Sequence, residues 1–171
     1  MNTPTRVVVA DANILINLCH AGLLSILERL RGFEFIVPAE VDAEITDAYQ
    51  RQQLDEMLAR DVVKREVLAS PAELTIYAEL RAIMGSGEAA CIAIAQSRGM
   101  YIASDERRAF LREVKARVGD SKLMTTPGLF VLAIRAGLLT IDGADAAKKV
   151  LEQHRFKMRF ASFADVVSPK N

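Results

Sequence analysis

The sequence predicts an α/β fold with three layers (α/β/α), in which a central, mostly parallel sheet is flanked by helices. Three observations lead to this prediction. Short apolar runs alternate with segments of helical periodicity, which is the spacing of βαβ units. The apolar run 7–10 stops at Asp11, and helical periodicity begins straight after it. The segment 88–95 is apolar almost all round, so we expect it to form a central helix.

Glycine and proline mark the elements of the first half of the chain. Gly22 interrupts one helical pattern and Gly32 ends another, because glycine readily adopts the left-handed backbone that closes a helix. Pro38 stands where proline can open a helix. In order, we expect a strand over 6–10, a helix through 18–20, a helix over 23–30, a strand over 33–37, a helix from 38, a helix over about 50–60 and an edge strand over 61–68.

A capping box begins the second half. Ser70 is followed by Pro71 and, three residues on, by Glu73, a pattern typical of a helix N-terminus. We expect a helix from there to about residue 84, a helix from 88 to Gly99, a strand over 100–103, a charged helix over 106–118, a short strand over 122–125 and helices over 129–136 and from 142 to about 154. No repeat, low-complexity tract or linker separates these elements, so we expect one domain over residues 1–171.

Composition limits the class of protein. Of the 171 residues, 51% are apolar and 26% charged, which excludes a disordered chain, and no apolar stretch is long enough to cross a bilayer. Residues 1–5 lack the features of a secretion signal, which favours the cytoplasm and no membrane partner. The formal net charge is zero, so contacts with nucleic acid must come from local patches. Cys19 and Cys91 lie among apolar neighbours, where core packing is favoured over a disulfide or metal site.

Four carboxylates can reach one edge of the predicted sheet, and each also has a simpler explanation. Asp11 and Asp105 follow strands, where aspartate often caps the next helix. Glu44 can be a solvated helical residue, and Glu88 can interact with the dipole of the helix that it begins. Because the carboxyl ends of parallel strands form the ligand-binding edge of a sheet, the combination is more specific than its members.

A bound cation would make such a group of carboxylates tolerable. Four uncompensated carboxylates repel one another and raise one another's pKa. Oxygen ligands of this kind suit Mg²⁺ or Mn²⁺. Such an ion lowers the pKa of a bound water and neutralises charge on a phosphodiester under attack. The sequence therefore predicts a metal-dependent nuclease.

Other chemistries have less support. His20 and His154 have no neighbouring serine or cysteine in a nucleophile turn, and no cysteine or histidine spacing indicates zinc. The segment 85–87 lacks the third glycine of a phosphate-binding loop, and the glutamate after it would repel phosphate. Phosphatases with a strand-end aspartate nucleophile have a second acid two residues on, where this chain has Asn13.

Nearly the whole chain resembles PIN-domain proteins, and it is similar to the VapC-type toxin ribonucleases of prokaryotic toxin–antitoxin pairs. The Asp11-Ala12-Asn13 stretch and the Gly87-Glu88 pair carry much of this resemblance. The matching segments are 9–18, 36–44, 87–95, 104–109, 126–128 and 135–139. Their order and spacing are more specific than any one of them.

The resemblance implies a PIN-like fold with an acidic pocket that binds Mg²⁺ or Mn²⁺, and hydrolysis of RNA by metal-activated water to leave a 5′-phosphate and a 3′-hydroxyl. The matching acidic quartet, expected to be catalytic and to bind the metal, is Asp11, Glu44, Glu88 and Asp105. Asn13 and Ser104 are expected beside these ligands.

Two departures from the resemblance bear on activity. Ala12 stands where relatives often have threonine, so one hydroxyl is missing. Ser104 occupies a position that is acidic in some relatives, so the resemblance leaves open whether the site binds one metal ion or two.

Basic residues gather in two places. The first set lies in the helix next to Asp105 and consists of Arg107, Arg108, Arg112, Lys115 and Arg117. These side chains could track an RNA backbone or belong to a solvated helix face paired with Glu106 and Glu113. A second set lies in the last helix and the tail, at Lys148, Lys149, Arg155, Lys157 and Arg159. This set could face RNA, a partner or water.

Partners follow from the resemblance alone. It implies a small antitoxin protein and, in many relatives, a homodimer. Apolar residues that could line a groove for a partner helix, or equally belong to the core, are Leu23, Leu27, Leu54, Met57 and Leu58. Two alternatives to a toxin stay open: a housekeeping nuclease that processes RNA or DNA, and a catalytically silent PIN fold that serves as a binding module.

Overall fold

One parallel sheet organises the chain. Within residues 4–167, which the computed structural model describes, five strands are arranged in the order β3-β2-β1-β4-β5, and every neighbouring pair is parallel. The strands are β1 (Arg6–Ala10), β2 (Phe33–Pro38), β3 (Val63–Glu66), β4 (Tyr101–Ala103) and β5 (Leu123–Met124). The first strand is thus central, and β3 is an edge strand as predicted. The ends of the domain predicted over 1–171, residues 1–3 and 168–171, lie outside the described residues.

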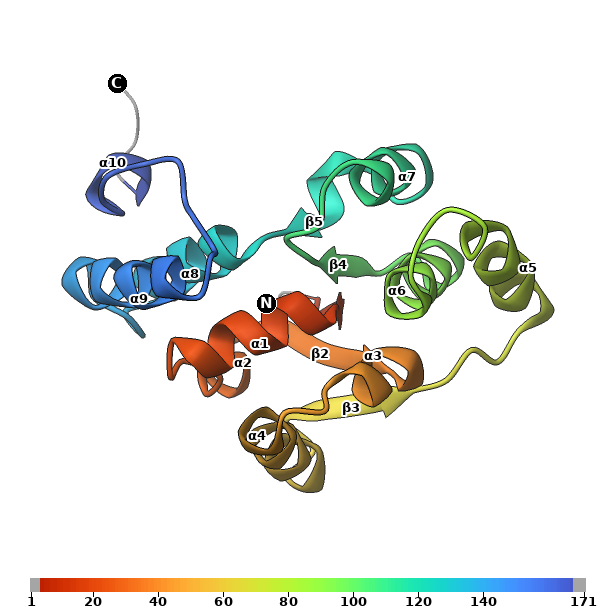
Figure 1. Cartoon of the computed structure of the whole chain (residues 1–171), viewed down its shortest axis with the longest axis horizontal. Coiled ribbons are helices and arrows are strands. Elements are labelled where there is room, and N and C mark those ends of the chain that lie inside the picture. Colours follow the sequence, from red (N-terminus) through yellow and green to blue (C-terminus); the bar gives the residue numbers. More distant parts are fainter. Residues whose placement is uncertain (1–3, 168–171) are drawn as a thin grey trace.

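Helices cover both sides of this sheet, which confirms the predicted three-layer α/β/α fold. In Figure 1, α5, α6 and α7 lie on one side, and α1, α8 and α9 lie on the other. The helices are α1 (Ala12–His20), α2 (Ile26–Arg29), α3 (Ala39–Glu44), α4 (Ala48–Ala59), α5 (Pro71–Leu80), α6 (Ser86–Arg98), α7 (Ala109–Arg117), α8 (Thr126–Arg135), α9 (Ile141–Gln153) and α10 (Ala164–Val167). None of the described helices is long and apolar enough to cross a membrane.

Helix α6 is the central helix that the sequence predicts. Its residues 89–95 are all buried, and most are alanine or isoleucine. Alanine lets a helix approach the sheet closely, and isoleucine fills the space between them. Gly99, with a left-handed φ of 66°, ends the helix and leads into β4.

The structure differs from the prediction at the starts of two helices, and it contains one helix that was not predicted. The helix expected over 23–30 covers only Ile26–Arg29, because turns occupy the residues before it. The helix expected from Glu106 begins at Ala109, because Arg108 has a φ of 53° and interrupts the helical backbone. The short helix α10 was not expected.

The apolar residues considered for a partner groove belong to the core. Leu27, Leu54 and Met57 are buried, and Leu23 and Leu58 pack against them at the margin of the core. Both cysteines are also buried and form no disulfide.

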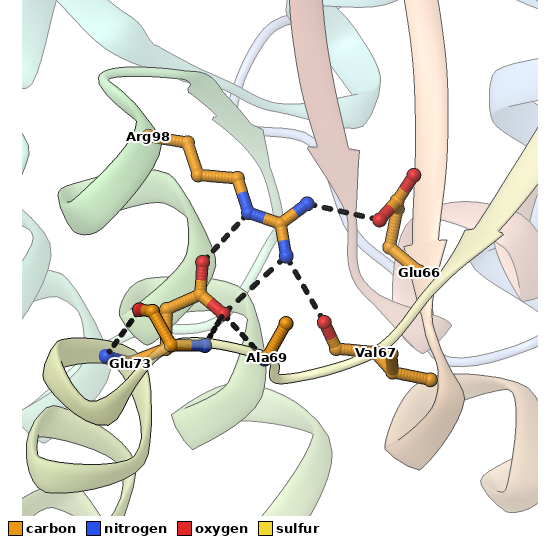
Figure 2. Close-up of polar contacts among 6 residues, drawn as sticks. Glu66, Val67, Ala69, Glu73 and Arg98 are labelled. Atoms are coloured by element: carbon orange, nitrogen blue, oxygen red, sulfur yellow. Dashed lines mark hydrogen bonds and ion pairs between the residues drawn. The ribbon is translucent and has the colours of Figure 1, made fainter.

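An ion-pair network joins the end of β3, the first turn of α5 and the end of α6 (Figure 2). The guanidinium of Arg98, at the end of α6, donates to the carboxylate of Glu73 at 2.7 and 3.3 Å and to that of Glu66 at 2.9 Å. It also donates to the carbonyl of Val67 at 3.0 Å. Glu73 accepts further hydrogen bonds from the amides of Ala69 and Ser70, which close the predicted capping box. The network therefore fixes the chain between β3 and α5 against the end of α6.

We predict that Glu73→Gln destabilises the protein by about 2 kcal/mol at pH 7, because it leaves a partly buried Arg98 without its main partner. The hydrogen bond from Arg98 lowers the pKa of Glu73 from 4.5 to about 2. Its stabilising effect is therefore complete above pH 4.5 and is lost as the pH falls through 2. Urea denaturation of both proteins at several pH values measures this. Glu66→Gln, at the more exposed partner, is the control with the smaller effect, and an equal loss at pH 7 and pH 2 would contradict the account.

Candidate active site

Asp11 lies at the centre of the candidate site, where β1 ends and α1 begins. Its backbone amide donates to the carbonyl of Ala103 on β4, which fixes the end of one strand against the other. One carboxylate oxygen accepts a hydrogen bond from the amide of Ala12 at 2.8 Å and caps α1. The other accepts from the hydroxyl of Ser104 at 2.8 Å and from the side-chain amide of Asn13 at 3.3 Å. The side chain is 3% exposed, so capping and burial both hold this carboxylate in one position.

Asn13 links Asp11 to the loop that follows β4. Its carbonyl oxygen accepts from the backbone amide of Asp105 at 3.1 Å, and its amide nitrogen donates to Glu106 Oε1 at 3.0 Å. The hydroxyl of Ser104, which donates to Asp11, also accepts from the amide of Glu106 at 3.1 Å. The loop is therefore folded back onto the start of α1, and Glu106 is brought beside Asp11.

The carboxylate of Asp105 is directed to α8. Its two oxygens accept from the amide of Thr126 at 2.8 Å and from its hydroxyl at 2.5 Å, and Asn17 donates to it at 3.0 Å. Burial raises the pKa of Asp105, although these hydrogen bonds oppose the rise. Asp105 thus joins the loop after β4 to α1 and to the first turn of α8.

Glu44 lies at the end of α3, against the first turn of α6. Its Oε1 accepts from the backbone amide of Gly87 at 2.8 Å. A Cβ on residue 87 would lie only 2.7 and 2.8 Å from the two carboxylate oxygens of Glu44. Only glycine at position 87 leaves room for the Glu44 carboxylate in this position. This contact accounts for Gly87 without a phosphate-binding loop.

The carboxylates of the site affect one another. The pKa of Asp11 is raised to about 6, chiefly by burial and further by Glu106 and Glu88. Burial, Glu106 and Glu44 raise the pKa of Glu88 in the same way. In the described part of the chain, neither these four carboxylates nor Asp105 forms an ion pair with a lysine, arginine or histidine. The site is a set of acids that forms no ion pair with a cation in the described residues, although the charge of Arg107 lowers the pKa of Asp105.

The chemistry of this donor set fits a hard divalent cation, because carboxylate oxygens are the ligands that Mg²⁺ and Mn²⁺ prefer. Among residues 4–167, however, no three Asp, Glu, His or Cys side chains already stand where they could hold one ion together. The side chains of Glu44 and Glu106 are exposed and that of Glu88 is half-buried, whereas Asp11 is held fixed.

Glu106 is the residue that sequence reasoning missed. The sequence suggests that it begins a helix and pairs with the basic residues after it. The left-handed backbone of Arg108 delays that helix by three residues, so Glu106 belongs to the loop and contacts Asn13. The adjacent acids at 105 and 106 were the available signal, but their different hydrogen-bond partners depend on the loop conformation.

The basic residues after Asp105 divide into two groups. Arg117 pairs with Glu113 and Glu79, and Arg112 pairs with Glu113 at 3.6 Å, so the interpretation as a salt-bridged helix face holds for both. Arg107 is exposed beside Glu106. A shallow basic surface along α7 is lined by the exposed side chains of Arg108, just before the helix, and of Arg112 and Lys115 on it.

Fold and site together define an α/β protein with an acidic centre at the carboxyl ends of the neighbouring strands β1 and β4. A family model described as a PIN domain matches residues 7–166, and the chain belongs to that family. One chain in the crystal structure of VapBC2 from Rickettsia felis, bound to a DNA fragment from their promoter, has a similar fold, with a TM-score of 0.51 and 16% identity. The similarity covers 70% of this chain and 97% of that one. No curated protein matches the chain by sequence.

We predict that Gly87→Ala displaces the Glu44 carboxylate with little effect on the fold, because the crowded atoms are the end of a flexible side chain. The change in unfolding free energy should stay within about 1 kcal/mol, since alanine is also the better helix former. The rise in Tm that a bound Mn²⁺ would cause should be smaller in this variant than in the wild type. Gly85→Ala is the matched control, since a Cβ there meets Glu88 Oε1 at an ordinary 3.7 Å. An equal response to Mn²⁺ in both variants and the wild type would show that the position of Glu44 does not matter.

Proposed function

We propose that this PIN-domain protein is a metal-dependent endoribonuclease. The observation that carries the proposal is the buried carboxylate of Asp11, surrounded by Glu88 and Glu106 and without a cationic partner. A folded protein has no structural reason to collect like charges around a buried acid, whereas a divalent ion gives such a group both a partner and a use. Asp11 and Glu106 also lie at the strand ends where ligands bind in α/β proteins.

The proposed ligands of Mg²⁺ or Mn²⁺ are Asp11, Glu44, Glu88 and Asp105. We add Glu106 to this proposed set because it contacts Asn13 and raises the pKa of Asp11. When bound, the ion supplies an activated water and neutralises charge on the phosphodiester. Asp11 is held in one position by Ser104 and Asn13. The more mobile ends of the exposed glutamates would turn toward it as the ion binds.

The residues around the carboxylates orient them and oppose the rise of their pKa. Ser104 and Ala12 donate to Asp11, and both hydrogen bonds lower its pKa against the effect of burial. Thr126 and Asn17 do the same for Asp105. The proposed reaction is hydrolysis of an RNA phosphodiester to a 5′-phosphate and a 3′-hydroxyl.

We further propose that the protein is the toxin of a type II toxin–antitoxin pair, with a small antitoxin as its partner. Membership of the PIN family and the fold shared with a chain of the VapBC2 complex support this role. A reading frame for a small protein next to the gene, and co-purification of the two products, would test it. A homodimer is part of the same proposal, and light scattering of the purified chain tests it.

We predict that Asp11→Asn abolishes cleavage of RNA, with a loss of at least about 100-fold, because it removes the central charged ligand. The Tm in EDTA should be unchanged or higher, since the substitution also removes a repelled, buried charge. Cleavage of a mixed set of single-stranded and structured RNAs measures the first effect and thermal denaturation the second. Asp142→Asn, an exposed acid in the first turn of α9, is the control. Cleavage by Asp11→Asn at the wild-type rate would refute the site.

We also predict that millimolar Mn²⁺ or Mg²⁺ raises the Tm of the wild type, because an ion that binds only the folded state stabilises it. At ten times its Kd the ion adds about 1.4 kcal/mol, which corresponds to a shift of a few degrees. Asp11→Asn should show a much smaller shift. The absence of any shift in the wild type at saturating metal would contradict a divalent site.

A further inference from the structure

A cavity of about 220 Å³ opens directly beside the acidic centre. Ser104, Asp105 and Glu106 form part of its wall, so it shares residues with the candidate site. The opposite wall is the segment 156–160, which follows α9 and returns toward the loop after β4. We call this space the aromatic cavity, after Phe156 and Phe160, which line it.

The two aromatic rings keep part of their apolar surface accessible, because the core does not bury them completely. Phe156 and Phe160 are each only partly buried. Phe160 packs edge-on against Phe163 with ring centroids 4.9 Å apart, and Phe163 packs against Phe130 at 5.6 Å. Phe163 and Phe130 are fully buried. The wall of the cavity is therefore supported from behind by the core.

Three cations surround the same cavity. Arg107, Lys157 and Arg159 line it, and all three are exposed. Within residues 4–167 none of them takes part in an ion pair. This differs from Arg98 and Arg117, whose guanidinium groups are each held between carboxylates. The three charges next to the aromatic rings are therefore available to an anionic ligand.

We propose that the aromatic cavity binds one unpaired nucleotide of a single-stranded RNA next to the bond that is cut. The base would stack on Phe156 or Phe160, and the three cations would neutralise the backbone phosphates on either side of this nucleotide. Aromatic faces and unpaired cations together are the elements with which proteins hold single strands. The proposal rests on the nuclease function for its choice of RNA, and it goes further by assigning a base-binding cavity and the side chains that line it.

The size of the cavity favours a single strand over a duplex. At about 220 Å³ it is smaller than the pockets of about 300–1,000 Å³ that enclose drug-sized ligands, so it has room for one base rather than a base pair. A paired base would first have to leave its stack to enter such a space. Discrimination between paired and unpaired RNA would thus arise at the site itself.

The basic surface of α7 extends the proposed path. Leu111 lines both the aromatic cavity and the shallow surface formed by Arg108, Arg112 and Lys115. A strand with one base in the cavity could therefore continue along α7 with its phosphates near these side chains. The segment 156–160 would select the nucleotide, and α7 would add affinity without sequence preference.

Fluorescence anisotropy with a fluorescein-labelled eight-nucleotide single-stranded RNA tests the proposal. Measuring in EDTA separates binding from cleavage. Phe156→Leu should weaken binding by about 10-fold through loss of stacking, and Phe156→Tyr should retain it. Changing both Arg107 and Lys157 to Gln should reduce the slope of log K against log salt by about 0.7 for each lost phosphate contact. Arg31→Gln is the control. Arg31 is exposed and precedes β2, so it lies near the amino end of a strand, whereas the cavity lies at the carboxyl end of β4.

Several results would overturn the proposal: no binding by the wild type, equal binding by Phe156→Leu and the wild type, or equal affinity for the same sequence as a duplex. If Phe156→Leu lowers the Tm, the exposed pair Arg107 and Lys157 still decides the matter through the salt slope. Binding through Phe156 without any cleavage in Mn²⁺ would refute the nuclease function alone. Metal-dependent cleavage that is lost in Asp11→Asn but unchanged in Phe156→Leu, with unchanged binding, would refute the cavity alone.

Discussion

The buried carboxylate of Asp11 is the constraint to which the rest of the site responds. It ends the central strand of the sheet, caps α1 and lies 2.8 Å from the hydroxyl of Ser104 on the neighbouring strand end. Burial makes its charge costly, and the acids around it increase that cost. The hydrogen bonds from Ser104, Asn13 and Ala12 offset only part of this. A divalent ion would balance the charge of these carboxylates. The ionised Asp11 that destabilises the fold is therefore also the residue on which the proposed function depends.

Helix α6 and the loop after β4 determine where the other acids lie. The alanine-rich helix α6 lies close to the sheet, and its first turn carries Glu88 while the amide of Gly87 holds Glu44. The loop after β4 uses its two adjacent acids differently, because Asp105 is fixed to Thr126 and Glu106 to Asn13. The other end of α6 is fixed by Arg98 at a separate network, so the helix is held at both ends. The position of the site is thus determined by the core.

The sequence predicts those features that depend on local patterns. The apolar runs identify β1 and β4 and place Asp11 and Asp105 at their ends, and the capping box at Ser70 is visible in the chain. What it does not reveal depends on contacts between distant residues. The direction of Asp105 toward Thr126 depends on the packing of α8, and the entry of Glu106 into the site depends on the backbone of Arg108. The aromatic cavity likewise forms only when the segment 156–160 packs against the loop after β4.

The central claim is that Asp11 is a ligand of a divalent ion together with neighbouring glutamates. A crystal grown with Mn²⁺, with diffraction data collected at the manganese absorption edge, locates the ion without recourse to activity. The account predicts an anomalous peak in contact with Asp11 and with at least one of Glu88 and Glu106, whose side chains would have turned toward it. The absence of a peak at Asp11 at saturating Mn²⁺, or a peak only elsewhere in the molecule, would contradict it.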